Sequence, residues 1–111
     1  MNKEVHKRLL DALIACGAIK QFLAGKTFED YQTDLLLRSG VERQFEIVGE
    51  ALHQAEVEDP DIQDVVPDLR LMVGMRNRII HGYHVVDNKV VWDTSQNDLP
   101  NLTNQLEAAL K

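Results

Sequence analysis

Apolar residues recur along this chain at steps of three and four, the spacing of one face of an amphipathic helix. The first stripe comprises Val5, Leu9, Ala12, Cys16, Ile19 and Leu23. A second stripe, in a longer helix predicted from about Asp34 to Val57, comprises Val41, Phe45, Val48, Leu52 and Ala55. Gly25 is expected to end the first helix, and Asp59-Pro60 is expected to end the second.

Capping residues and glycine mark the boundaries of three further predicted helical elements in the first two thirds of the chain. Thr27 is a predicted N-cap for a short helix, and a helical turn is expected over Asp61 to Asp68. A third long helix is predicted from about Asp68 to His81, and Gly82 is a natural stop for it.

The C-terminal third of the chain is also expected to be helical. Asp87 is a predicted cap for one helix, and Pro100 fits the first turn of a last helix. A small hairpin that pairs Val85-Val86 with Val90-Val91 is an alternative for this segment. Because no long stretch alternates with a period of two, the sequence predicts a single all-α domain over residues 1–111, a bundle of four to five helices.

The bulk composition is that of a soluble globular protein, with 44% hydrophobic and 27% charged residues in 111. No apolar run approaches the ~20 residues that cross a bilayer, and the N-terminal segment lacks the apolar block of a signal peptide. The lone cysteine, Cys16, cannot form an internal disulfide, which fits a reducing compartment. We therefore expect a cytoplasmic protein with no membrane association.

The net charge of -6 argues against broad, nonspecific binding of nucleic acid, because such binding needs a basic protein surface. It leaves room for a small basic site on an acidic body. The segment from Arg70 to Lys89 is such a region, because its only acidic residue is Asp87. Its basic and titratable residues are Arg70, Arg76, Arg78, His81, His84 and Lys89.

Arg76 is predicted to lie in the middle of an apolar stripe. With a turn of about 100° per residue, five apolar side chains fall within roughly 60° of it. They are Leu69, Met72, Val73, Ile79 and Ile80. An arginine so placed is expected to face a cavity or to pair with a carboxylate, for which Glu46 and Glu50 on the preceding helix are the candidates. A purely structural buried ion pair is the alternative.

Arg70, Gly74, Asn77 and His81 follow steps of four, three and four, so they share a flank of the same helix. Gly74 costs ~1 kcal/mol of helix stability relative to alanine, which suggests that a helix, a second subunit or a ligand packs closely there. Asn77 lies one turn before His81, where it can hydrogen-bond the imidazole or a substrate oxygen. The alternative for His81 is a helix-terminal histidine that interacts with the C-terminal dipole.

A metal site is not expected. His81 and His84 are three residues apart, but no third ligand is evident near them, and no cofactor-binding motif is present. A guanidinium that can hold a phosphate, beside an imidazole that titrates near neutral pH, is instead a minimal set of groups for cutting a phosphodiester.

The segment G-M-R-N-R-I-I-H-G-Y, residues 74–83, resembles the signature of HepT-type toxins of the HEPN superfamily. That signature is an arginine, four residues, a histidine, one residue and a tyrosine. Four further blocks resemble the family in the family order: T-F-E-D (27–30), R-Q-F-E-I-V-G-E-A (43–51), V-V-W-D (90–93) and N-D-L-P (97–100). Gln44 departs from the pattern, where asparagine is expected.

The resemblance implies an all-α homodimer with a composite cleft, in which the two copies of the motif face each other. It implies a metal-independent endoribonuclease that acts on cellular RNA, tRNA or mRNA. It also implies a cognate antitoxin of the minimal nucleotidyltransferase type, which neutralises the toxin by transferring AMP to the motif tyrosine, here Tyr83.

These implied roles agree with the chemistry of the residues. RNA supplies its own 2′-hydroxyl nucleophile, so His81 would act as general base or acid and Arg76 would hold the scissile phosphate. Asn77 would orient His81 or the substrate. Two other functions are kept open: a non-catalytic helical partner that binds nucleotide or assists a nucleotidyltransferase, and a structural dimerisation module. Arg76 and His81 together favour the enzyme, because a pure binding module needs no titrating histidine.

Overall fold

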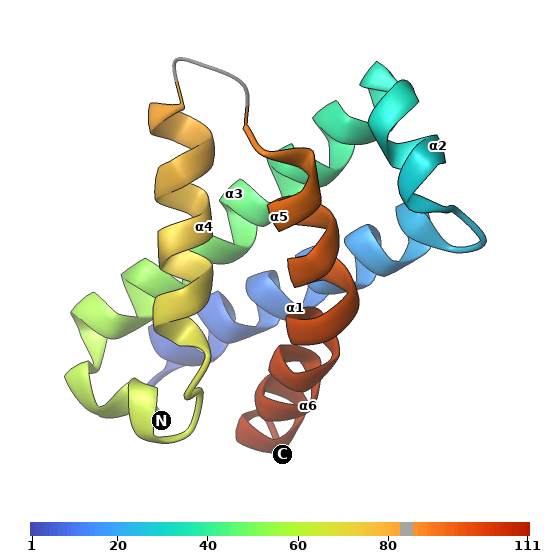
Figure 1. The fold of residues 1–111 in the computed structure, drawn as a ribbon. Coiled ribbons are helices and arrows are strands. Elements are labelled where there is room, and N and C mark those ends of the chain that lie inside the picture. The colour runs from blue at the N-terminus through green and yellow to red at the C-terminus, as the bar shows by residue number, and fades with distance from the viewer. Residues whose placement is uncertain (83–85) are drawn as a thin grey trace.

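The computed structural model describes residues 1–82 and 86–111, and all its regular elements are helical (Figure 1). In chain order they are α1 (Lys3–Leu23), α2 (Phe28–Thr33), α3 (Leu35–Glu58), the 3-10 helix η1 (Pro60–Asp64), α4 (Leu69–His81), α5 (Asn88–Asp93), the π-helical segment η2 (Thr94–Asp98) and α6 (Leu99–Ala109). Elements α5, η2 and α6 follow one another without a break. The predicted all-α bundle is confirmed over the described residues.

The hairpin alternative is wrong for the part of it that the structure describes. Val90 and Val91 lie inside α5, which begins after Asp87. The Asp87 carboxylate accepts a hydrogen bond from the backbone N–H of Lys89 at 2.9 Å and so satisfies a free donor of the first turn. The cap therefore starts a helix where a hairpin would need a turn. Val85 lies outside the described residues.

Helices α1 and α3 lie side by side along most of their length, and α4 and α6 pack across this pair (Figure 1). The short helix α2 packs against α3 and α5, where the Trp92 ring lies about 6 Å from those of Phe28 and Tyr31. Among the helices of the described residues, none combines the length and the apolar character needed to cross a bilayer.

Capping hydrogen bonds and one glycine conformation explain where α1 ends and where α2 and α3 begin. Thr27 and Asp30 form a reciprocal capping box at the start of α2, in which each side chain accepts from the other's backbone N–H. Gly25, just after α1, has a φ of 74°, a conformation that other residues rarely adopt. The carboxylate of Asp34 accepts from the backbone N–H of Leu37 at 3.1 Å and caps α3.

The π-helical segment was not predicted from the sequence. Pro100 does lie in the first turn of α6, as expected, but α6 continues α5 instead of starting anew. Proline lacks an N–H and its ring clashes with the carbonyl four residues earlier in a regular α-helix. A wider turn relieves that clash, and the backbone N–H of Leu99 donates to the carbonyl of Thr94, five residues earlier.

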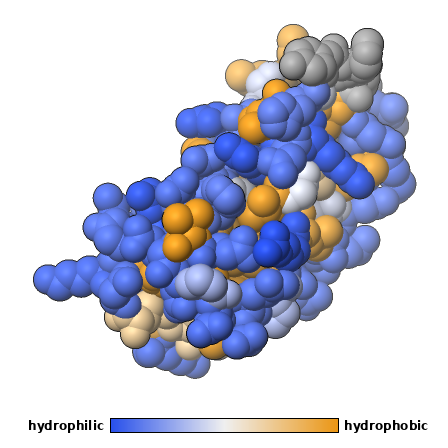
Figure 2. Space-filling view, turned by 90° about the vertical axis from the view of Figure 1, so that its left-hand side faces the viewer, coloured by the Kyte–Doolittle hydropathy of each residue, from blue (hydrophilic) through white to orange (hydrophobic). Residues whose placement is uncertain are grey.

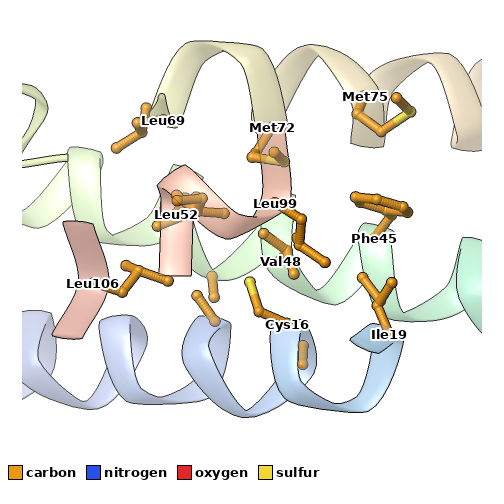
Figure 3. Close-up of a cluster of buried hydrophobic side chains, with 14 of the residues drawn as sticks. Cys16, Ile19, Phe45, Val48, Leu52, Leu69, Met72, Met75, Leu99 and Leu106 are labelled. Atoms are coloured by element: carbon orange, nitrogen blue, oxygen red, sulfur yellow. The ribbon is translucent and has the colours of Figure 1, made fainter. Parts of the chain in front are cut away.

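The core fills the space between α1, α3, α4 and α6. Figure 3 shows apolar side chains from these four helices meeting there, among them Cys16, Phe45, Met72 and Leu106. Every position of the two predicted apolar stripes is buried. Burial also raises the pKa of the Cys16 thiol to about 12, so this side chain is a neutral core residue and not a nucleophile.

Gly49 allows α4 to lie directly on the backbone of α3. A Cβ placed on Gly49 would come within 2.8 Å of the carbonyl oxygen of Met72 and would overlap the Cβ of Arg76. No side chain larger than hydrogen fits at this crossing without moving a helix. The contact therefore fixes the distance between Arg76 and the backbone of α3.

We predict that Gly49→Ala lowers the free energy of unfolding, because overpacking at a rigid contact costs about 1 to 3 kcal/mol. Gly17→Ala is the matched control, since a Cβ at Gly17 on α1 meets nothing within 4 Å. That control should raise stability by about 0.5 to 1 kcal/mol through helix propensity. Urea unfolding measures both values. Equal stability of the two variants would show that the crossing is not tight.

Candidate active site

An open groove of about 570 Å³ lies between α1, α3 and α4. Each helix contributes one arginine to it: Arg8 from α1, Arg43 from α3 and Arg76 from α4. Its remaining lining residues are Asp11, Ile14, Ala15, Gln44, Glu46, Ile47, Glu50, Ala51 and Ile80. The groove is thus mixed in charge, with three guanidinium groups and three carboxylates over an apolar floor.

Arg76 faces this groove and also has a carboxylate partner. Its Nη2 lies 2.8 Å from Oε2 of Glu50, and its Nη1 donates to Oδ1 of Asn77 at 2.9 Å. The side chain of Arg76 is 25% exposed and that of Glu50 is 51% exposed. The pair therefore lies at the wall of the groove, in reach of a ligand, and is not a sealed structural ion pair.

Glu46, the other candidate partner of Arg76, pairs with Arg43 instead, at 3.0 Å. The two residues are three positions apart on α3, so their side chains lie on neighbouring turns of the same helix. Glu50 lies one turn further along α3, next to the Gly49 crossing, which places its carboxylate opposite Arg76. Of the two candidate partners, Glu50 therefore pairs with Arg76 and Glu46 does not, although both glutamates line the groove.

The predicted flank of α4 faces solvent. Arg70 is exposed and pairs with Glu56 at 3.1 Å. A Cβ at Gly74 would meet nothing within 4 Å, so the close neighbour expected there is not within the described part of this chain. Asn77 is exposed and accepts a hydrogen bond from Arg76, not from His81.

His81 is the last residue of α4 and is exposed to solvent. It does not line the groove that Arg76 faces. Five residues correspond to a rise of about 7.5 Å and a rotation of about 140° along a helix, so the two side chains leave α4 in different directions. One chain therefore presents Arg76 near the middle of α4 and His81 at its end, without bringing the two side chains together. Tyr83 lies outside the described residues.

Sequence reasoning missed the α1 side of the groove. Arg8, Asp11 and Ala15 follow steps of three and four and share a face beside the main apolar stripe. The available signal was Ile14, a large apolar residue off that stripe, which is 64% exposed. Figure 2 shows one face of the molecule, on which hydrophobic residues emerge as separate patches in a mostly hydrophilic surface.

Comparisons with known proteins place the sequence in one family. The sequence profile described as Ribonuclease HepT-like matches residues 12–109. A relative from Thermococcus cleftensis, named "Probable ribonuclease HepT", is 33% identical over 110 residues, which cover 98% of this chain and 99% of the relative. A relative from Caldanaerobacter subterraneus subsp. tengcongensis, named provisionally as an RNase, is 30% identical over 86% of this chain and 85% of its own length.

The chain therefore belongs to the ribonuclease HepT-like family, a HEPN-type all-α fold. A relative from Methanocaldococcus jannaschii, also named provisionally as an RNase, is 26% identical over 99% of this chain. No solved structure matches the chain significantly. The residues matched by the family profile include Arg76 and His81 and the groove residues of α3 and α4, but not Arg8 and Asp11 of α1.

We predict that the ion pair between Arg76 and Glu50 positions Arg76 and contributes little to stability. A double-mutant cycle of Arg76→Ala and Glu50→Ala, followed by urea unfolding, should give a coupling below about 1 kcal/mol, as for exposed pairs. If Arg76→Ala or Glu50→Ala alone costs about 3 to 5 kcal/mol, the pair is a buried structural element and the groove assignment fails.

Proposed function

We propose that this protein is a metal-independent endoribonuclease that cuts cellular RNA, tRNA or mRNA, and acts as the toxin of a toxin–antitoxin pair in the cytoplasm. The observation that supports this most strongly is Arg76, held by Glu50 and Asn77 at the wall of an open groove, on the same helix as an exposed His81. Membership of the ribonuclease HepT-like family supports the same activity.

The proposed reaction uses the 2′-hydroxyl of the RNA. An imidazole removes the 2′-proton, the 2′-oxygen forms a bond to phosphorus, and the bond from phosphorus to the 5′-oxygen breaks. A second proton transfer neutralises the departing 5′-oxygen. The products are a 2′,3′-cyclic phosphate and a 5′-hydroxyl. Arg76 stabilises the charge that develops on the phosphorane oxygens, and Asn77 orients Arg76.

A homodimer completes the site in this proposal. The reaction needs two proton transfers, and each chain offers one histidine in the motif. Because Arg76 and His81 leave α4 in different directions, a second copy that faces the first can bring an imidazole toward the other guanidinium. The open space beside Gly74 leaves room for a close neighbour from outside the chain.

The proposed antitoxin is a minimal nucleotidyltransferase that transfers AMP from ATP to Tyr83. The phenol oxygen attacks the α-phosphorus of ATP, pyrophosphate leaves, and the phenol proton passes to a base. The attached AMP adds bulk and negative charge beside the motif, where an RNA phosphate has to bind. Steric exclusion and charge repulsion would each inhibit cleavage.

We predict that Arg76→Ala and His81→Ala each reduce RNA cleavage by about 10² to 10⁴-fold, the usual contribution of a charge-stabilising or proton-transferring group. Arg78→Ala is the matched control, because Arg78 is an exposed arginine on the same helix that does not line the groove. It should keep activity near the wild-type value. Cleavage of labelled RNA in EDTA measures all three variants.

Growth arrest on expression of wild type, relieved by His81→Ala, would show the same dependence in cells. A non-catalytic partner of a nucleotidyltransferase is the competing function, and the acidic net charge is compatible with it. Intact RNA at every concentration of purified wild type would favour that function and contradict the nuclease.

We predict that incubation with the antitoxin and ATP adds the mass of one AMP to Tyr83 and lowers RNA cleavage in proportion to the modified fraction. Tyr83→Phe should gain no mass under the same conditions. Tyr31→Phe should gain the same mass as wild type, because the buried hydroxyl of Tyr31 is not accessible to the antitoxin. Intact-mass and peptide mass spectrometry make the measurement. Modification at any other residue would contradict the proposal.

A further inference from the structure

Arg8 has no assigned role in the site described above, yet it lines the same groove as Arg76 from the opposite helix. Its side chain is partly buried, and its Nε is buried without a hydrogen-bond partner in the described part of the chain. No ion pair joins Arg8 to any carboxylate among those residues, although Asp11 lies one turn away on α1.

A buried guanidinium nitrogen without an acceptor is unusual, because proteins satisfy the great majority of buried donors. The other two arginines of the groove differ in this respect. Arg43 has Glu46, and Arg76 has Glu50 and Asn77. The groove thus holds two arginines that its own residues position and one that lacks an acceptor. The terminal nitrogens of Arg8 are not buried and make no ion pair with a described residue, so an anionic ligand in the groove can reach them.

We propose that Arg8 binds a second phosphate of the RNA, next to the scissile phosphate that Arg76 holds. This inference rests on the proposed ribonuclease function and assigns a substrate-binding residue on α1. Arg8 lines the groove from one side and Arg76 from the other, so one strand that lies in the groove contacts both. A guanidinium binds a pair of phosphate oxygens with two parallel hydrogen bonds, and the two terminal nitrogens of Arg8 can donate both.

The overall charge strengthens this assignment. A protein of net charge -6 repels RNA over most of its surface, so its cations must act where the strand lies. Glu46 and Glu50 are already paired with Arg43 and Arg76, which reduces their repulsion of a phosphate. Asp11 is the remaining carboxylate of the groove and makes no ion pair with a described residue.

The test compares Arg8→Gln with Lys7→Gln. Lys7 is the preceding residue on α1, is exposed and does not line the groove, so its substitution removes the same charge from nearly the same place. The probe is a fluorescein-labelled RNA oligonucleotide with 2′-O-methyl groups, which removes the nucleophile and prevents cleavage. Fluorescence anisotropy over a range of salt concentrations gives the Kd and its salt dependence.

Arg8→Gln should raise the Kd about tenfold and reduce the slope of log Kd against log salt by about one, as for the loss of one phosphate contact. Lys7→Gln should change the Kd by less than about twofold. On unmodified RNA, Arg8→Gln should raise KM while kcat stays within about threefold, whereas His81→Ala lowers kcat. Equal effects of the Arg8 and Lys7 variants would overturn the proposal.

Folding and assembly controls complete the test. Because Arg8 makes no pair among the described residues, Arg8→Gln and Arg8→Met should unfold at or above the wild-type urea midpoint. Failure of both variants to fold would assign Arg8 a structural partner and reject the proposal. Loss of the dimer in sedimentation, with an unchanged salt slope, would assign Arg8 to a carboxylate of a second copy.

These outcomes also separate the inference from the function on which it rests. If wild type neither binds nor cuts RNA, the proposed function fails. If wild type cuts RNA and the Arg8 variants behave like Lys7→Gln, only the second phosphate contact is rejected.

Discussion

The bare backbone of Gly49 is the contact on which the site depends. At this point α4 lies on α3 without an intervening side chain, so the position of Arg76 is set by helix packing and not by a flexible loop. The adjacent Glu50 then receives the guanidinium at 2.8 Å. Gly49 thus allows α4 to pack closely on α3, and Glu50 then orients the Arg76 guanidinium at the edge of the groove.

The same arrangement lets an acidic protein hold several cations in one place, as the proposed phosphate binding requires. The groove collects one arginine from each of three helices, and two of them are held by glutamates of α3. Such half-exposed pairs contribute little to stability, but they restrict where the cations point. The arginine and glutamate side chains lose their conformational entropy when the protein folds, so little more is lost when a substrate binds.

Periodicity predicted the fold well because the apolar stripes determine which faces are buried. The stripes of α1 and α3 are buried at every position, and Thr27, Asp34 and Asp87 act as caps. The continuity of α5 and α6 through a π-helical turn could not be predicted in the same way. Proline at position 100 is compatible either with a new helix or with a widened one, and tertiary packing decides between them.

The site was only partly predictable. Arg76 was found because an arginine in an apolar stripe needs a cavity or a partner, and Glu50 was one of two candidates four residues apart on one face of α3. To choose between Glu46 and Glu50, one must know where α3 and α4 cross. The residue pattern of a single helix does not give that point. Arg8 and Gly49 were missed for the same reason, since their roles arise only where two helices meet.

The central claim is that the 2′-hydroxyl of RNA is the nucleophile and that protein side chains, with no metal, perform the proton transfers. End-group analysis of RNA cut by the purified wild-type protein in EDTA tests it most directly. The account predicts fragments that end in a 2′,3′-cyclic phosphate and begin with a 5′-hydroxyl, and no cut where the adjoining ribose lacks its 2′-hydroxyl. Fragments with 5′-phosphates, or cleavage that EDTA abolishes, would contradict it.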